Sequence, residues 1–342
     1  MSGANKEMDF VNYLFAFTDD VGIFQHSKYG VPDRNHGYTT DDNVRALILT
    51  VTLYEKFGKK KYLDLIYKYL SFVHYALNDK GMFKNFMNYQ REFLEMQGSE
   101  DCFGRCIWAL GHTIASPAVP QNIKNTCTCI LKEAAKNIET ITAPRAKAYI
   151  IVGLSLLKDS EEMAAHIESL SMSLIEQYKK HKDKDWHWFE DSITYGNAFF
   201  PWSLFRAYKI LGKECYLETA KESMDFLESI VMKLDFFKPI GCNGWLVKGM
   251  DAAEYDEQPI EAGEMINAYM ANYEVTKDKK CLHNALKCFN WYNGKNSKNL
   301  SLIDIETGAC YDGISENGLN LNQGSESIIS YGMAVMKVSK IK

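Results

Sequence analysis

One pattern recurs along the chain: a loop with acidic or polar side chains leads directly into a helix that is apolar on nearly every side. Five clear copies begin within residues 38–45, 97–111, 186–197, 257–261 and 320–326. A weaker sixth copy begins near residue 142, with Arg145 in place of the acid. A helix that is apolar around its circumference must be buried on all sides. The chain therefore needs a fold in which six helices are completely covered.

Amphipathic helices rich in lysine and glutamate alternate with these apolar helices and would cover them. Short turns such as 57–60, 211–213 and 276–278 join the two kinds, and repeated hairpins of this sort build solenoids and toroids. We expect helices over 7–17, 41–57, 59–76, from 99 onward, 120–138, 144–157, 161–178, 194–211, 214–232, 259–276, 278–292 and 323–338. Pairing the first helix with the last closes a ring. The sequence thus predicts an all-α (α/α)6 toroid, with residues 1–342 as a single domain because no Pro/Gly/Ser-rich linker divides them.

The loops that precede the buried helices all fall on one rim of such a ring. Their carboxylates would crowd around one cavity, and crowding raises carboxyl pKa values so that one proton can be shared near neutral pH. Cleavage of a glycosidic bond needs a protonated acid and an ionised partner. The candidate catalytic residues are Asp41, Asp42, Glu100, Asp101, Glu190 and Glu261. The alternative is that acids in a first helical turn only complement the helix dipole.

Within this group we expect Asp101 to be the general acid, because it lies one residue deeper than Glu100 in an apolar helix and desolvation would raise its pKa. Asp42 is expected to be the base or nucleophile, with Arg45 one turn later keeping it ionised. Glu261 and Glu190 are the reserve candidates.

Aromatic and polar side chains in the same loops suit a sugar ligand, since a flat ring can cover the apolar face of a sugar. Trp186, Trp188 and Trp245 flank glycines and acids, whereas Trp108 and Trp291 fit helical stripes and are expected in the core. The full set of expected substrate-binding residues is Tyr38, Arg45, Arg105, Trp186, Trp188, Tyr195, Asn197, Trp245, Gln258, Asn320, Gln323 and Glu326.

Several of these motifs together resemble a known family. They are residues 36–43 (HGYTTDDN), 98–101 with Gly104 and Arg105, 188–190 with 194–197, 258–261, and 312–313 with 320–327. They are similar to bacterial (α/α)6 glycoside-hydrolase-like proteins that are often associated with glycosyltransferases. The resemblance spans nearly the whole chain and implies the toroid, sugar chemistry and a glycosyltransferase partner. The adjacent aspartates also resemble those of endo-mannanases, and the chain departs from the family pattern at Gly196 and Glu257.

Composition argues against several other classes of function. The net charge of −5 gives no basic surface for nucleic acid. No run is long enough to span a membrane, and residues 1–6 do not look like a secretory signal. Nine cysteines, several in apolar helices, are typical of free thiols in a reducing compartment, so we expect a cytoplasmic protein. No zinc-ligand spacing is present, and we expect neither a metal nor a cofactor.

We therefore expect a glycoside hydrolase that acts on a neutral oligosaccharide or polysaccharide, with mannose-containing chains as one candidate. Two alternatives stay open. A sugar epimerase of the same fold would need catalytic histidines, and only His36, His112 and His187 lie near the relevant loops. A non-catalytic glycan-binding partner of a glycosyltransferase would use the carboxylates to hold sugar hydroxyls. A lanthionine cyclase and a polysaccharide lyase fit less well, since the first needs a Cys-Cys-His zinc site and the second an acidic sugar.

Overall fold

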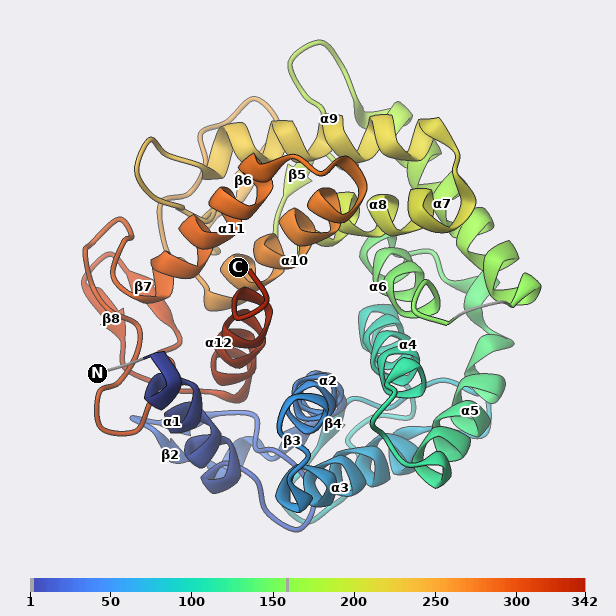
Figure 1. Ribbon diagram of the computed structural model, residues 1–342, viewed down its shortest axis with the longest axis vertical. Coiled ribbons are helices and arrows are strands. Elements are labelled where there is room, and N and C mark those ends of the chain that lie inside the picture. Colours follow the sequence, from blue (N-terminus) through green and yellow to red (C-terminus); the bar gives the residue numbers. More distant parts are fainter. Residues whose placement is uncertain (1–2, 158–159, 342) are drawn as a thin grey trace.

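Twelve α-helices form two concentric rings in the computed structural model, which describes residues 3–157 and 160–341 (Figure 1). The inner ring consists of α2 (Thr40–Phe57), α4 (Glu100–Ala115), α6 (Pro144–Leu154), α8 (Phe199–Leu211), α10 (Pro259–Thr276) and α12 (Ser325–Val338). The outer ring consists of α1 (Gly3–Ala16), α3 (Lys60–Ala76), α5 (Gln121–Ala135), α7 (Glu161–His181), α9 (Glu214–Val231) and α11 (Lys279–Tyr292). The all-α (α/α)6 toroid expected from the sequence is confirmed.

Each inner helix packs against the next one, and α12 packs against α2, so the inner ring is closed. The closest approach lies between α4 and α6. A Cβ atom on Gly111 would lie 2.3 Å from the backbone oxygen of Gly153, so a larger side chain cannot fit there. The chain ends meet as expected: α1 packs on α12, where the rings of Phe10 and Tyr331 lie edge to face at 6.0 Å.

Side-chain caps set the starts of two inner helices, α2 and α4. The Thr39 side chain accepts a hydrogen bond from the Asp42 backbone N–H at the start of α2, and Ser99 does the same for Cys102 in α4. These caps place the following acids in the first turn, next to the positive end of the helix dipole. Inner and outer helices alternate along the chain, so the N-terminal ends of all six inner helices lie at one rim of the ring.

Four two-stranded antiparallel sheets were not expected from the sequence. They pair β1 (Ser27–Lys28) with β2 (Val31–Pro32), β3 (Tyr38–Thr39) with β4 (Phe86–Met87), β5 (Ser192–Ile193) with β6 (Leu246–Val247), and β7 (Gly313–Ser315) with β8 (Gly318–Asn320). Short 3-10 helices span Arg34–His36 and Ile138–Thr140. The sheets tie together loops that are distant in sequence and shape the rim.

One helix begins later than expected. A start at Thr194 was predicted, but α8 begins at Phe199, because Ser192 and Ile193 pair with β6 and Gly196 adopts a positive φ of 61°. Residues 192–198 instead form a loop whose backbone reaches the acids of the ring. Among the described helices, none is both long and apolar enough to cross a membrane.

Candidate active site

A polar cavity of about 360 Å³ opens at the rim formed by the N-terminal ends of the inner helices. Helix α2 contributes Asp41, Asp42 and Arg45, and α4 contributes Arg105. The remaining polar lining comes from Gln25, His26, Thr39, Asn85, Gln258, Asp312, Asn320, Glu326 and Ser327. The structure therefore brings together loops that are up to 300 residues apart, as the toroid requires.

Arg45 links two acids on one side of this cavity. Its Nη2 lies 3.5 Å from Oδ1 of Asp42, and its Nη1 lies 2.6 Å from Oε2 of Glu326. Asp42 also accepts a hydrogen bond of 2.5 Å from the Thr39 hydroxyl. Burial nevertheless outweighs these contacts and raises the pKa of Asp42. This direction is opposite to the one expected from the sequence, where Arg45 was expected to keep Asp42 ionised.

Arg105 links the next pair of acids. Its Nη1 lies 3.0 Å from Oδ2 of Asp41, and its Nη2 lies 3.8 Å from Oδ2 of Asp101 and 3.0 Å from the hydroxyl of Tyr149. The Tyr195 hydroxyl donates a 2.9 Å hydrogen bond to the same oxygen of Asp101. Asp101 is thus tied to Arg105 and Tyr195, and its expected role as general acid stays a prediction.

Arg145 fixes the loop that carries Tyr195. Its Nη1 lies 2.7 Å from Oε2 of Glu190, and its Nε donates a 2.6 Å hydrogen bond to the backbone oxygen of Tyr195. The guanidinium also lies 4.8 Å from the centre of the Tyr195 ring, within the range of a cation–π contact. Glu190 is thus held by a positioning contact at the edge of the site.

Two acids on α10 form a buried pair. Glu261 accepts hydrogen bonds from the Gly196 backbone N–H at 2.8 Å and from the Asn197 side chain at 3.0 Å. Burial raises the pKa of Glu261 to about 7. Glu264 follows one turn later, and its Oε2 has no hydrogen-bond partner within the described residues. Burial and the neighbouring Glu261 hold the pKa of Glu264 well above its usual range.

Glu264 was missed in the sequence analysis, although a signal was present. A second acid three residues after Glu261, inside a helix that is otherwise apolar, has no solvated face to occupy. Asp312 was noted only within a motif. It accepts hydrogen bonds from the Ser327 hydroxyl at 2.6 Å and the Gly324 N–H at 2.7 Å, and burial raises its pKa.

Glu100 does not face the cavity. Its carboxylate accepts hydrogen bonds from the backbone N–H groups of Thr142 at 2.8 Å and Ala143 at 2.5 Å, directly before α6. Adjacent helical residues point about 100° apart, so Asp101 turns inward while Glu100 turns toward the neighbouring helix. The catalytic assignment of Glu100 is corrected to capping of α6.

Seven of the expected substrate-binding residues do not line this cavity: Tyr38, Trp186, Trp188, Tyr195, Asn197, Trp245 and Gln323. Trp186 and Trp188 are 6% and 0% exposed, because Trp186 packs on Phe226 of α9 and Trp188 packs on Phe189 and Phe200. Tyr38 is buried against Phe24 and donates to Asp19 at 2.6 Å. Gln323 is also buried and donates a hydrogen bond to Asp304 at 2.9 Å. The two tryptophans and Tyr38 are core residues, and Gln323 positions its loop.

Tyr195 and Trp245 lie outside the cavity lining and form an aromatic pair, and their expected role in stacking on a sugar stays a prediction. The β5–β6 pairing brings their loops together, with ring centres 6.3 Å apart, and Tyr195 is 40% exposed. Gln258, Asn320 and Glu326 line the cavity as expected. Asn197 is buried and acts through Glu261. Within the described residues, no three His, Cys, Asp or Glu side chains are grouped to hold a metal ion.

Comparison with known proteins finds similar folds among solved structures. No family model matches the chain, and no curated protein matches its sequence. Among solved structures, a sugar epimerase from a ruminal bacterium is similar with a TM-score of 0.76 and 12% identity, covering 100% of both chains. A GH76 α-mannanase from Bacteroides thetaiotaomicron has a TM-score of 0.71 and 11% identity, covering 99% of this chain and 96% of its own.

A cellulase of C. cellulolyticum in complex with cellobiose is similar over 99% of both chains, with a TM-score of 0.70 and 11% identity. These three proteins carry out different reactions. At such low sequence identity, the matches support a shared fold and not a shared activity. Together with the closed double ring of helices, the full-length matches show that the chain is an (α/α)6 toroid.

Proposed function

We propose that this protein is a glycoside hydrolase that cleaves a neutral oligosaccharide or polysaccharide at the cavity beside Asp41 and Asp42. The observation that carries the proposal is the contrast between these adjacent acids. Both line the cavity, but burial raises the pKa of Asp42, whereas Asp41 is paired with Arg105 at 3.0 Å. Asp42 is thus suited to hold a proton, and the Asp41 carboxylate beside the Arg105 cation is placed to act as its partner, as glycosidic cleavage requires.

In the proposed reaction the Asp42 carboxyl protonates the glycosidic oxygen of the leaving sugar. The Asp41 carboxylate either attacks the anomeric carbon or removes a proton from the attacking water. Asp101, on the other side of Arg105, is the reserve for this second role. Tyr195 and Trp245 would stack on a neighbouring sugar ring, and Gln258 and Asn320 would bind hydroxyl groups.

A neutral substrate fits the charges around the cavity. Asp41, Asp42, Asp312 and Glu326 line it, with Arg45 and Arg105 already engaged by acids. An acidic sugar would meet mostly carboxylates, and like charges disfavour binding. Mannose-containing chains are the first choice to test, because adjacent aspartates resemble those of endo-mannanases and a GH76 α-mannanase shares the fold.

The experiment is a reducing-end assay across a panel of mannans, cellulose fragments and other neutral glycans. On a cleaved substrate, Asp42→Asn and Asp41→Asn should each reduce turnover by roughly two to four orders of magnitude. Asp251→Asn, an exposed aspartate outside the cavity, is the matched control. Asp42→Asn should recover activity on aryl glycosides whose leaving group needs no protonation, and Asp41→Asn should not. Full activity of both variants on the natural linkage would reject the assignment.

A sugar epimerase or isomerase is the second candidate, favoured by one observation. His26 lines the same cavity as Asp312, and an imidazole is a suitable base for the proton beside a sugar carbonyl. Several solved structures with this fold are described as epimerases or an isomerase. Incubation of cellobiose or mannose in deuterated water tests this reaction, since an epimerase would exchange the C2 hydrogen and a hydrolase would not.

A non-catalytic glycan-binding partner of a glycosyltransferase is the remaining alternative. The same variants separate it from an enzyme. If the protein only binds glycans, Asp41→Asn and Asp42→Asn should weaken glycan affinity. If it is an enzyme, they should reduce turnover while affinity is largely kept.

A further inference from the structure

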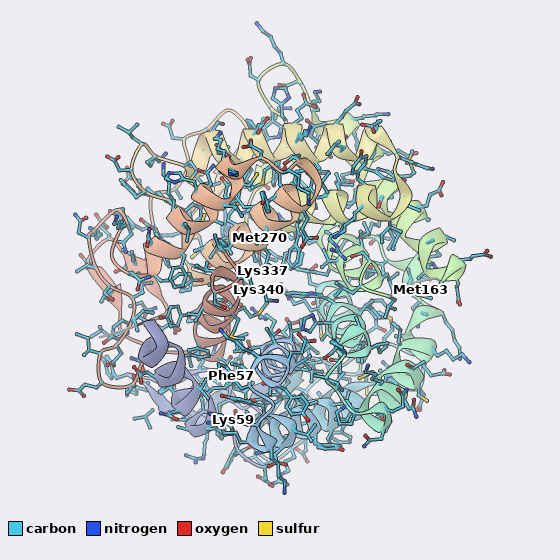
Figure 2. All side chains as sticks on the ribbon, viewed as in Figure 1. Phe57, Lys59, Met163, Met270, Lys337 and Lys340 are labelled. Atoms are coloured by element: carbon cyan, nitrogen blue, oxygen red, sulfur yellow. The ribbon has the colours of Figure 1, made fainter. Side chains whose placement is uncertain are left out.

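A second cavity, of about 190 Å³, lies at the opposite end of the toroid. All six inner helices contribute to it, through Thr52, His112, Val152, Arg206, Asn267 and Lys337. Thr52 lies ten residues after Asp42 on α2, which corresponds to about 15 Å along the helix. The cavity is therefore separate from the candidate active site. Figure 2 shows Lys337 and Lys340 at the centre of the ring.

The charges around this second cavity do not balance. Arg206, Lys337 and Lys340 line it, with Glu274 as the only lining carboxylate, and Glu274 is already shared. Its Oε2 lies 2.6 Å from Nζ of Lys209 and 3.4 Å from Nη1 of Arg206. Across residues 3–157 and 160–341, neither Lys337 nor Lys340 forms an ion pair. The cavity thus carries an excess of positive charge.

The helix dipoles stabilise only some of the cations that make up this excess of positive charge. The inner helices end here, and cations near helix C-termini are stabilised by the helix carbonyls. Arg206 is used in this way, because its Nη2 donates a 2.9 Å hydrogen bond to the backbone oxygen of Ser155. Lys337 differs, since burial lowers its pKa to about 8, and the cations Lys340, Arg206 and Lys209 act in the same direction against the opposing charge of Glu274. An anion placed among these cations would relieve that repulsion.

The rest of the lining is apolar or neutral. The rings of Trp108 and Trp202 meet edge to face at 5.6 Å, beside Ile48, Val152 and Met333. His112 contacts the Thr52 hydroxyl at 3.2 Å, and burial together with the nearby lysines lowers its pKa to about 4, so it is neutral at pH 7. A dry cavity of roughly 150 Å³ can hold a benzene ring, so this one has room for a body of about that size.

We propose that this cavity is a binding site for a small organic anion, whose phosphate or carboxylate head contacts Lys337, Lys340 and Arg206 while its compact apolar body lies against Trp108 and Trp202. The ligand contacts both the cationic and the apolar part of the cavity lining. Its occupancy does not depend on the reaction at the other rim. The site can therefore be tested on the intact protein without any glycan.

The test uses phenyl phosphate, benzoate and inorganic phosphate as probes, in chloride-free buffer, with calorimetry and tryptophan fluorescence as readouts. Phenyl phosphate or benzoate should bind saturably, and the tighter of the two identifies the preferred head. Phenol, which has the ring without the charge, should bind more weakly. Lys337→Met should weaken binding at least about tenfold, as expected for losing a charged hydrogen bond. Lys59→Met, at the periphery of the same rim, is the matched control (Figure 2).

Lys340→Gln gives an independent test, because Lys340 is exposed and its loss should not prevent folding. The proposal is overturned if no organic anion binds the wild-type protein saturably, or if phenol binds as tightly as phenyl phosphate. It is also overturned if Lys337→Met and Lys340→Gln both bind like Lys59→Met. Binding of inorganic phosphate alone, with no gain from the phenyl group, would overturn the assignment of the apolar body.

Discussion

Glu264 lies one helical turn beyond Glu261 on α10, and the two carboxyl groups are buried together beneath the loop of Gly196 and Asn197. Glu261 takes hydrogen bonds from that loop at 2.8 and 3.0 Å, whereas Oε2 of Glu264 has no partner within the described residues. Burial raises the pKa of both groups. Two buried acids one turn apart can hold one proton between them at neutral pH.

This pair predicts a specific pH dependence of stability. A carboxyl group whose pKa is higher in the folded chain than in the unfolded chain binds more protons when folded, so its contribution to stability is lost as pH rises. Burial and the neighbouring Glu261 hold the pKa of Glu264 well above its usual range, so the folded chain keeps a proton on Glu264 that the unfolded chain loses as pH rises, and one pKa unit corresponds to about 1.4 kcal/mol. Glu264→Gln should therefore be more stable than the wild type at pH 8, by roughly 1 kcal/mol or more, with a smaller advantage at pH 5.

Urea unfolding of both proteins from pH 5 to pH 8 measures this difference. Taking the difference removes the contributions of His112 and Lys337, which titrate in both proteins. Glu92→Gln, an exposed glutamate in the loop after β4, is the control and should match the wild type at every pH. A stability difference that is constant across pH would refute the shared proton.

Arg105 is predicted to hold the acids of the site in place. Removing one partner of a buried ion pair leaves an uncompensated charge, so Arg105→Met should lower the free energy of unfolding by about 3 to 5 kcal/mol. Adding Asp41→Asn and Asp101→Asn should recover much of this loss, because both carboxylates contact Arg105. Arg91→Met, which breaks the exposed pair with Asp20, should change stability by only about 0 to 1 kcal/mol. Thermal and urea unfolding would contradict the account if the triple variant were less stable than Arg105→Met.

The tryptophans should separate into two classes. Trp188→Ala should lower the free energy of unfolding by about 3 to 5 kcal/mol, since the side chain is completely buried. Trp245→Ala should leave the melting temperature nearly unchanged and weaken binding of a glycan substrate by about tenfold. Calorimetric melting and glycan titration of both variants provide the measurement. If Trp245→Ala melts as early as Trp188→Ala, Trp245 belongs to the core.

Glu100 and Asp101 should differ although they are neighbours. Glu100→Gln is expected to lower stability by about 1 kcal/mol, through its hydrogen bonds to the backbone before α6, and to leave turnover intact. Asp101→Asn should reduce turnover, because it removes a carboxylate beside the cavity. It should also disturb Tyr195, whose hydroxyl donates a hydrogen bond to Asp101. Turnover rates of both variants test this difference. An equal loss of turnover would show that Glu100 also acts in the active site.

The ring could be predicted from the sequence because its cause is local. Alternation of fully apolar helices with amphipathic ones leaves few arrangements that bury the first kind, and Ser99 or Thr39 at a helix start fixes where the following acids lie. The gathering of Asp41, Asp42 and Glu326 at one cavity follows from the closure of the ring.

The orientation of single side chains could not be predicted, because it depends on partners that are distant in sequence. Trp186 is buried by Phe226 of α9, which lies about forty residues later in the chain. The start of α8 moved because β5 pairs with β6, more than fifty residues later. The pKa of Asp42 depends on how much water is excluded around it, which the position of Arg45 alone does not reveal.

The most direct test of the central claim is mass spectrometry of the sugar products formed in water enriched in ¹⁸O. The panel of neutral glycans is incubated with the wild type and with Asp42→Asn. The account predicts shorter products from the wild type that carry one ¹⁸O at the new reducing end, and a loss of these products in the variant. Glycans that stay intact, with or without a change at C2, would contradict hydrolysis at this cavity.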